Sequence, residues 1–178
     1  AAVLGLDDAA ANRVLDAQLA VLSSEAVVNG VVVPVLQEIG ERWQRGSVTV
    51  AEEHFASNLI RARLLGLARG WGRGIGPAVV LACVPGERHD IPLIVRGLGL
   101  RERGFRITFL GADTPVADVS PVVSRVGAVA VVVVGVTPGI LEASARELRR
   151  LDLGRRLVLG GPDASSALAK RVGARLLD

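Results

Sequence analysis

The change of hydrophobic pattern after residue 77 limits the possible folds more than any other feature of this 178-residue chain. From Ala78 onward, short apolar runs alternate with amphipathic stretches, a pattern typical of buried strands and helices respectively. Parallel strands need a helix to return the chain, so these repeated units predict a parallel sheet with helices on both faces. We expect strands at 78–84, 106–110, 128–136, 156–159 and 174–177, with helices between them at 91–103, 115–126, 140–151 and 164–172.

The first seventy residues carry helix signals instead. Capping residues at 7–8 and 23–24 can begin two helices that run to about residue 22 and about residue 45. Pro34 should kink the second helix or break it near Asn29-Gly30. A third helix should begin at a capping box formed by Thr49 and Glu52 and end near residue 70. These signals predict a small helical bundle.

The glycine-dense stretch 70–77, GWGRGIGP, separates the two patterns. Its glycines follow a helix and precede a strand, whereas a dinucleotide fingerprint follows a strand and opens a helix. We therefore predict a linker and no phosphate loop. The expected fold class is α/β, with an N-terminal helical bundle cap over residues 1–72 and a flavodoxin- or Rossmann-like parallel-sheet domain over residues 77–178.

Composition bears on several classes of protein. The longest apolar stretch, 126–136, has 11 residues and two glycines, whereas a membrane-spanning helix takes about 20, so no membrane partner is expected. The single cysteine, Cys83, allows no internal disulfide, which favours a cytoplasmic location. The formal net charge is only +3, and the chain has just two Trp and three Phe. This is a weak footprint for nucleic-acid binding by these residues.

The loops that follow the expected strands are the natural place for a ligand, because parallel sheets bind ligands beyond the carboxyl ends of their strands. The first loop contains Glu87, His89 and Asp90. Histidine is the commonest metal ligand, and its binding nitrogen is better oriented when the other ring nitrogen donates to a carboxylate. Glu87 and Asp90 are both close enough to be that carboxylate, although these residues alone also fit a solvated loop histidine. His54 lacks an HExxH motif, so it gives no support to a zinc hydrolase.

Glu87-x-His89, the loop that begins at Gly111, and the pair Gly160-Gly161 together resemble a known family. It is the cobalamin-binding domain shared by methionine synthase, corrinoid methyl carriers and mutases, which carries DxHxxG, a serine in the third loop and a glycine pair. The resemblance implies that His89 binds cobalt from below and that Glu87 holds the imidazole. It also implies that the glycine pair leaves room for the nucleotide tail of the cofactor.

Three positions depart from the pattern of that family. Glu87 replaces the aspartate, and Pro92 occupies the position of the glycine. The third loop has Gly135 where the serine would be, so Thr137 offers the nearest hydroxyl. The first change preserves a carboxylate for His89, whereas the other two concern how the nucleotide tail is held.

The helical half has a motif of its own. Nine residues separate Trp43 from Glu53-His54, which resembles the W-x9-EH motif of CarH-type photoreceptors. In that family a helical bundle covers the upper face of adenosylcobalamin, and the tryptophan shields the adenosyl group. The resemblance assigns these binding roles to Trp43, Val50, Glu53 and His54, although a helix tryptophan more often packs in a core. At the position after the tryptophan this sequence has Gln44, whereas the type member of that family has a histidine that binds cobalt after photolysis.

The resemblance implies a cobalamin-binding sensory module, with adenosylcobalamin favoured and methylcobalamin as the other form. Its role would be that of a photoreceptor that controls an attached output, with transcriptional regulation as the first expectation, and not that of an enzyme. We expect a homo-oligomer that responds to light, with DNA bound only through a domain outside these residues. Two alternatives stay open: a corrinoid protein that carries a methyl group for methyltransferases, and a photoreceptor with an additional or different tetrapyrrole, such as a bilin.

Overall fold

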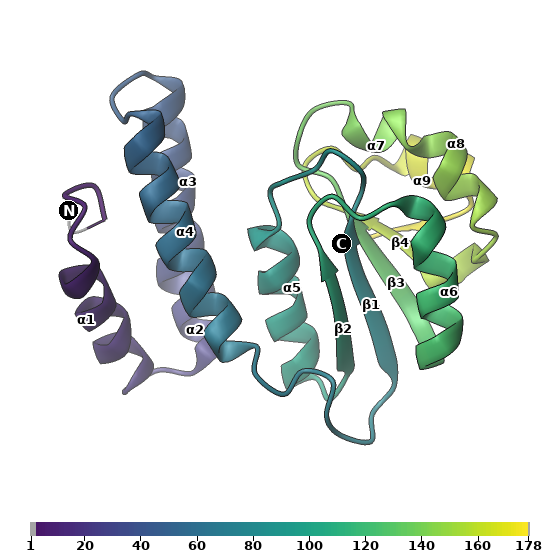
Figure 1. Ribbon diagram of the computed structural model, residues 1–178, viewed down its shortest axis with the longest axis horizontal. Helices are drawn as coiled ribbons and strands as arrows, with labels where there is room; N and C mark the ends of the chain where they lie inside the picture. The colour runs from purple at the N-terminus through teal and green to yellow at the C-terminus, as the bar shows by residue number, and fades with distance from the viewer. Residues whose placement is uncertain (1–2, 178) are drawn as a thin grey trace. The chain divides into compact units, whose positions relative to one another are not determined.

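The computed structural model describes residues 3–177, which divide into two compact units between Arg69 and Gly70 (Figure 1). The first unit is helical, and the second contains a five-stranded sheet. This confirms the predicted fold class, N-terminal helices followed by an α/β domain. The helices of the first unit are α1 (Asp8–Leu19), α2 (Ser24–Val27), the π-helix η1 (Val28–Val32), α3 (Val33–Gln44) and α4 (Val50–Leu67).

Side-chain caps begin three of these helices where the sequence placed them. The carboxylate of Asp7 and the hydroxyl of Ser23 each accept a backbone N–H from three residues further on. At α4 the capping box is complete: Thr49 Oγ1 accepts the N–H of Glu52 at 3.2 Å, and the Glu52 carboxylate accepts the N–H of Thr49 at 2.8 Å. These bonds satisfy N–H groups that have no partner within the helix.

Pro34 produces a π-turn instead of ending the helix. The segments α2, η1 and α3 follow one another without a gap, and η1 contains Asn29 and Gly30, where the irregularity was predicted. Within this turn the N–H of Val33 donates to the carbonyl of Val28, five residues earlier. A π-turn accommodates a residue that cannot donate to the ordinary helical partner.

The buried apolar residues of the first unit lie on facing sides of its helices. They are Ala11 on α1, Val27, Val28, Val32 and Ile39 along α2 to α3, Val48 before α4, and Ala56, Leu59, Ile60 and Leu64 on α4. Burial of such side chains stabilises a helical unit more than intrinsic helix propensity does. Among the described residues, no helix has the length and apolar character that crossing a lipid bilayer requires.

The sheet of the second unit is parallel throughout, with the order β2-β1-β3-β4-β5. Runs of small and β-branched residues, which are buried on both faces of a parallel sheet, form its centre. From β1 the chain first moves to one side of the sheet and then returns to the other, which makes the β1/β3 boundary the topological switch point. The strands are β1 (Ala78–Cys83), β2 (Arg106–Gly111), β3 (Ala128–Val134), β4 (Leu157–Gly160) and β5 (Arg175–Leu176).

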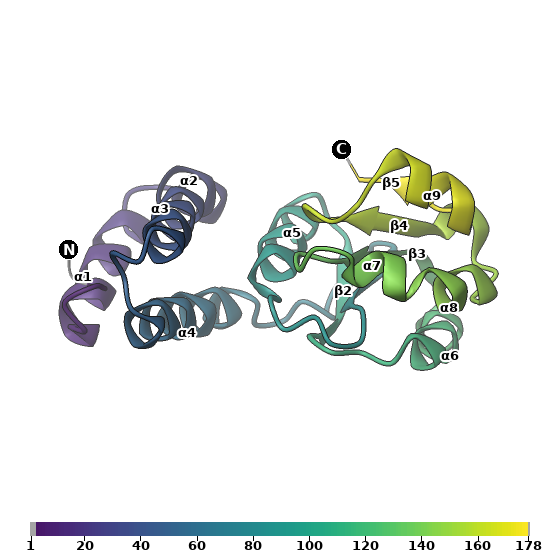
Figure 2. The same cartoon turned by 90° about the horizontal axis from the view of Figure 1, so that it is seen from above.

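Helices cover both faces of the sheet, as Figure 2 shows. One face carries α5 (Ile91–Glu102), and the other carries α6 (Val116–Val126), α7 (Ile140–Ala143), α8 (Ala145–Arg150) and α9 (Ser166–Val172). The helices α6 to α9 share one apolar cluster with β1, β3 and β4. The single helix predicted at 140–151 is therefore two short ones, divided at Ser144. A short 3-10 helix, η2 (Gly154–Arg156), leads into β4.

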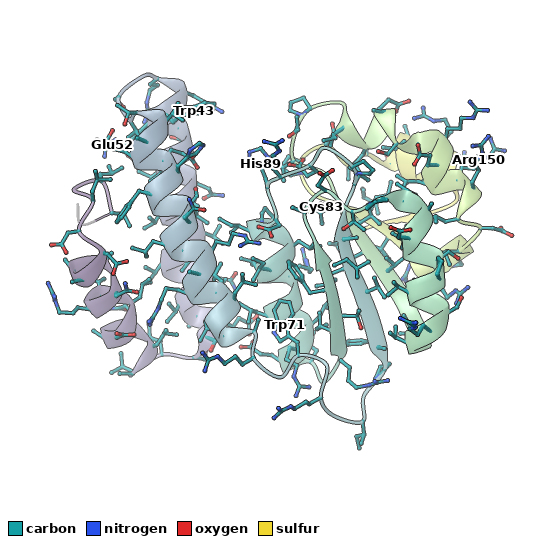
Figure 3. The ribbon with its side chains drawn as sticks, viewed as in Figure 1. Trp43, Glu52, Trp71, Cys83, His89 and Arg150 are labelled. Atoms are coloured by element: carbon teal, nitrogen blue, oxygen red, sulfur yellow. The ribbon has the colours of Figure 1, made fainter. Side chains whose placement is uncertain are left out.

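Trp71 fixes the linker to the second unit (Figure 3). Trp71 is only 7% exposed, and its ring makes an edge contact with the ring of Phe109 at a centroid distance of 5.6 Å. The backbone carbonyl of Trp71 accepts the N–H of Ile107 in β2. The indole also lies against α5 at Gly97, where no side chain separates the helix from the ring.

We predict that Gly97→Ala lowers the free energy of unfolding, because the new methyl carbon would lie 2.5 Å from Trp71 Cη2 and 2.9 Å from Leu81 Cδ1. Overpacking costs about 1–3 kcal/mol, whereas alanine favours a helix over glycine by about 1 kcal/mol. Gly99→Ala in the same helix is the control, since its methyl carbon would meet only the flexible guanidinium of Arg103. Urea unfolding should give a lower midpoint for Gly97→Ala alone, and an unchanged midpoint would contradict this packing.

Candidate functional site

The loops after β1, β2, β3 and β4 lie together at one edge of the sheet, which we call the rim (Figure 3). It is formed by residues 84–90, 111–115, 135–139 and 160–165. Gly111 ends β2 with φ of +87°, a backbone conformation that favours glycine. Because the switch point lies between β1 and β3, their two loops form the centre of the rim.

His89 is held at the rim by Glu87. The Nδ1 atom of His89 lies 2.7 Å from Glu87 Oε1, and the backbone N–H of His89 donates to the same oxygen at 2.8 Å. An ionised carboxylate only accepts hydrogen bonds, which assigns the proton to Nδ1 and leaves the Nε2 lone pair of the neutral ring free. The His89 side chain is 65% exposed, while that of Glu87 is fully buried. His89 thus offers Nε2 at the rim in the form that binds a metal ion.

Glu87 also joins the two central loops. Its second oxygen, Oε2, accepts the backbone N–H groups of Val136 and Thr137, both at 2.7 Å. The hydroxyl of Thr137 is 3.3 Å from Glu87 Oε1 and 3.5 Å from His89 Nδ1. Of the two carboxylates that the sequence left open, Glu87 is therefore the partner of His89, and Asp90 is buried at the start of α5.

These contacts keep the Glu87 carboxylate ionised. Burial opposes ionisation, but the N–H groups of Thr137, His89 and Val136 outweigh it, and the pKa of Glu87 falls to about 2. The pKa of the Cys83 thiol moves the other way, to about 12, because it is buried and lies close to acidic groups. Cys83 therefore stays a neutral thiol and is a poor nucleophile.

Two further carboxylates join neighbouring rim loops, and our sequence analysis did not single them out. Asp113 Oδ1 accepts the N–H of Gly86 at 2.7 Å, which joins the β2 loop to the β1 loop. Asp163 accepts the N–H groups of Gly139 at 2.6 Å and Leu141 at 2.8 Å, which joins the β4 loop to the segment after β3. Asp113 lies two residues after the end of β2, and Asp163 lies three residues after the end of β4. An aspartate this close to the end of an expected strand is the sequence signal that could have found them.

The rim glycines allow two loops to approach closely. A methyl carbon on Gly161, where φ is +90°, would lie 2.2 Å from the carbonyl oxygen of Gly135. On Gly135 it would lie 2.5 Å from Leu141 Cγ, and on Gly160 it would lie 2.9 Å from Leu177 Cδ2. Contacts within the chain thus explain all three glycines. The role in holding a nucleotide tail that the resemblance gave to Gly160 and Gly161 stays a prediction.

The remaining predicted site residues lie at one end of the first unit: Trp43, Val50, Glu53 and His54. Trp43 lies near the end of α3, and the other three belong to the first turns of α4. Trp43 is 48% exposed and Val50 is 54% exposed, so neither packs as an ordinary core residue. Glu53 accepts the Ser57 hydroxyl at 2.5 Å and lies 3.8 Å from His54 Nε2. Both apolar side chains are therefore accessible to a molecule that binds at this end of the unit.

A helical unit, a switch-point rim and an imidazole with a free Nε2 fit the class of cobalamin-binding proteins. Residues 1–65 match the family model of the B12 binding domain. The chain is similar to two proteins of Myxococcus xanthus. The HTH-type transcriptional repressor CarH is 40% identical over 118 residues, which are 66% of this chain and 40% of that protein. The HTH-type transcriptional repressor CarA is 42% identical over 106 residues, 59% of this chain and 35% of that protein.

Two solved structures share the fold. The monomethylamine corrinoid protein of Methanosarcina barkeri has a TM-score of 0.76 and 16% identity, over 98% of this chain and 87% of that chain. The methanol:cobalamin methyltransferase complex MtaBC of the same organism has a TM-score of 0.54 and 13% identity, over 99% of this chain and 71% of that chain. At these identities the likeness shows the fold alone.

We predict that Glu87→Gln lowers the free energy of unfolding by roughly 2–3 kcal/mol at pH 7, because an amide NH2 would face buried N–H donors. The folded-state pKa of Glu87 lies below its ordinary value near 4.5. The stabilisation is therefore complete above about pH 4.5 and is lost as the pH falls toward 2. Urea unfolding at several pH values should show the gap between wild type and variant narrowing over that range.

Glu102→Gln, at an exposed glutamate of α5, is the control for this experiment. It should leave the unfolding midpoint close to that of wild type at each pH. A gap for Glu87→Gln that stays constant from pH 7 to pH 3 would show that the ionised carboxylate does not stabilise the rim.

Proposed function

We propose that this chain is the sensory module of an adenosylcobalamin-dependent photoreceptor that controls an attached output, with transcription as the output favoured here. The presentation of His89 Nε2 by the buried Glu87 carboxylate carries the cobalamin part of the proposal. The exposed Trp43 and Val50 support the adenosyl form. The names of the two Myxococcus repressors support regulation of transcription, although the aligned regions span less than half the length of each relative.

The second unit would hold cobalt through His89. Glu87 keeps the proton on Nδ1, which fixes the tautomer and the orientation of the ring and makes Nε2 a stronger donor. The amides of Val136 and Thr137 keep Glu87 ionised without a solvent contact. The residues present therefore fit a corrinoid that takes one imidazole on its lower face.

The first unit would sense the upper group. When bound, adenosylcobalamin supplies a cobalt–carbon bond that light can break. Trp43 and Val50 would provide apolar contacts for the adenosyl group, and Glu53 and His54 would provide polar ones. A ligand shifts a conformational equilibrium only through contacts that differ between the states. Release of the adenosyl group would remove contacts of this kind, so the module acts as a binding switch and needs no turnover.

Assembly and output belong to the same proposal. We expect a homo-oligomer whose size depends on light, and DNA binding with sequence specificity through residues outside this chain.

A methyl-carrying corrinoid protein is the second candidate, since the fold of the monomethylamine corrinoid protein covers 98% of this chain. A carrier must expose its upper face to partner enzymes, and a tryptophan over that face would obstruct them. A bound bilin would be recognised by the mass and colour of the purified pigment.

We predict that His89→Ala loses the imidazole-bound absorption spectrum of protein loaded with adenosylcobalamin in darkness. The affinity should fall by roughly 100-fold or more, because loss of an outer-shell partner alone typically costs about 10–100-fold. His54→Ala is the control, since His54 lies in the other unit and should leave the lower ligand in place. An unchanged dark spectrum for His89→Ala would disprove the assignment of the cobalt ligand.

Green light should change both the absorption spectrum and the solution size of the adenosylcobalamin-loaded chain. We predict that the illuminated wild type carries a single imidazole on cobalt, because Gln44 offers an amide where CarH-type proteins have a second histidine. Gln44→His should gain a second imidazole after illumination but not in darkness. Two imidazoles in illuminated wild type would contradict the role given to Gln44, and no response to light would favour the methyl carrier.

A further inference from the structure

The positive charge of this chain is concentrated in one segment. Residues 142–177 contain eight Arg and Lys and four Asp and Glu, a balance of +4. The remainder holds 13 basic and 14 acidic residues, a balance of −1, which together give the net charge of +3. The modest overall charge therefore hides a local excess within the second unit.

Five arginines within eleven residues account for most of this excess: Arg146, Arg149, Arg150, Arg155 and Arg156. We call them the α8–η2 arginine cluster. All five are exposed, and within residues 3–177 none of them forms an ion pair. Arg171 of the neighbouring α9 differs, because it pairs with Glu142. In Figure 3, Arg150 lies on the side of the second unit away from His89.

The spacing of the three arginines on α8 brings like charges together and therefore favours binding of an anionic partner. Arg146, Arg149 and Arg150 lie at i, i+3 and i+4 on α8, so their side chains are neighbours on the helix surface. Like charges at this spacing repel each other, and Glu147 is the one acidic residue of α8. Guanidinium groups bind phosphate through paired hydrogen bonds, which relieves this repulsion. A polymer with regularly spaced phosphates offers acceptors to several of these guanidinium groups at once.

We propose that the α8–η2 arginine cluster binds the phosphate backbone of duplex DNA without sequence preference. Single-stranded nucleic acid is held largely by stacking on aromatic side chains, and residues 142–177 contain no Trp, Tyr or Phe. The cluster would add a backbone contact to any specific DNA binding by the attached output. This inference does not depend on the identity of the cofactor.

Binding of the 178-residue chain to a labelled random-sequence 20-base-pair duplex, followed by fluorescence anisotropy, tests the proposal. We expect a Kd of about 10⁻⁶–10⁻⁴ M near physiological salt. The logarithm of the association constant should fall linearly with the logarithm of salt concentration, with a slope of about −0.9 per phosphate contacted. Absence of salt-dependent binding would overturn the proposal.

Two double variants separate the cluster from net charge. Arg149→Gln with Arg150→Gln should make the salt slope shallower by about 1.8, two contacts at about 0.9 each. Arg96→Gln with Arg125→Gln, at exposed arginines of α5 and α6, removes the same charge and should change the slope little. Circular dichroism should show that both variants are folded. Equal losses in the two variants, or tighter binding of single-stranded DNA or polyglutamate than of the duplex, would overturn the assignment.

Discussion

The carboxylate of Glu87 is the interaction on which the rim depends. One oxygen accepts the ring and the backbone of His89, and the other accepts two amides from the β3 loop, so a single buried charge is shared by both sides of the switch point. A buried carboxylate without these donors would be costly. With them it fixes the imidazole tautomer and holds the β1 and β3 loops together, and the extra methylene relative to aspartate does not prevent these contacts.

The other rim contacts extend the same arrangement across the sheet. Asp113 joins the β2 loop to the β1 loop, and Asp163 joins the β4 loop to the segment after β3. Close approach of Gly161 to Gly135 completes the connection between the last two loops. Each adjacent pair of loops in the order β2-β1-β3-β4 is thus bonded through a side chain of the chain itself. The frame that presents His89 is therefore held together by contacts within the chain.

Much of the fold could be predicted because local chemistry and tertiary structure agree. The valine run of β3, the caps at Asp7 and Ser23, and the Thr49–Glu52 box all form as the sequence indicates. The division of the 140–151 helix at Ser144 could not be predicted, because the hydrophobic periodicity of the sequence continues across this residue. The pairing of Glu87 with Val136 and Thr137 was equally hidden, because it joins residues 49 and 50 positions apart and depends on the order of the strands. Trp43 could not be placed from local pattern either. Its spacing along the helix is typical of a core residue, but its side chain is exposed.

The contrast between the two tryptophans has a practical consequence. The chain has no tyrosine, so ultraviolet emission comes from two indoles, one in each unit. Trp71 is 7% exposed and makes an edge contact with the ring of Phe109, whereas Trp43 is 48% exposed. The emission of Trp71 should consequently lie at shorter wavelength and resist aqueous quenchers such as acrylamide, and that of Trp43 should lie at longer wavelength and be readily quenched. Each half of the molecule therefore carries a built-in optical label of its own.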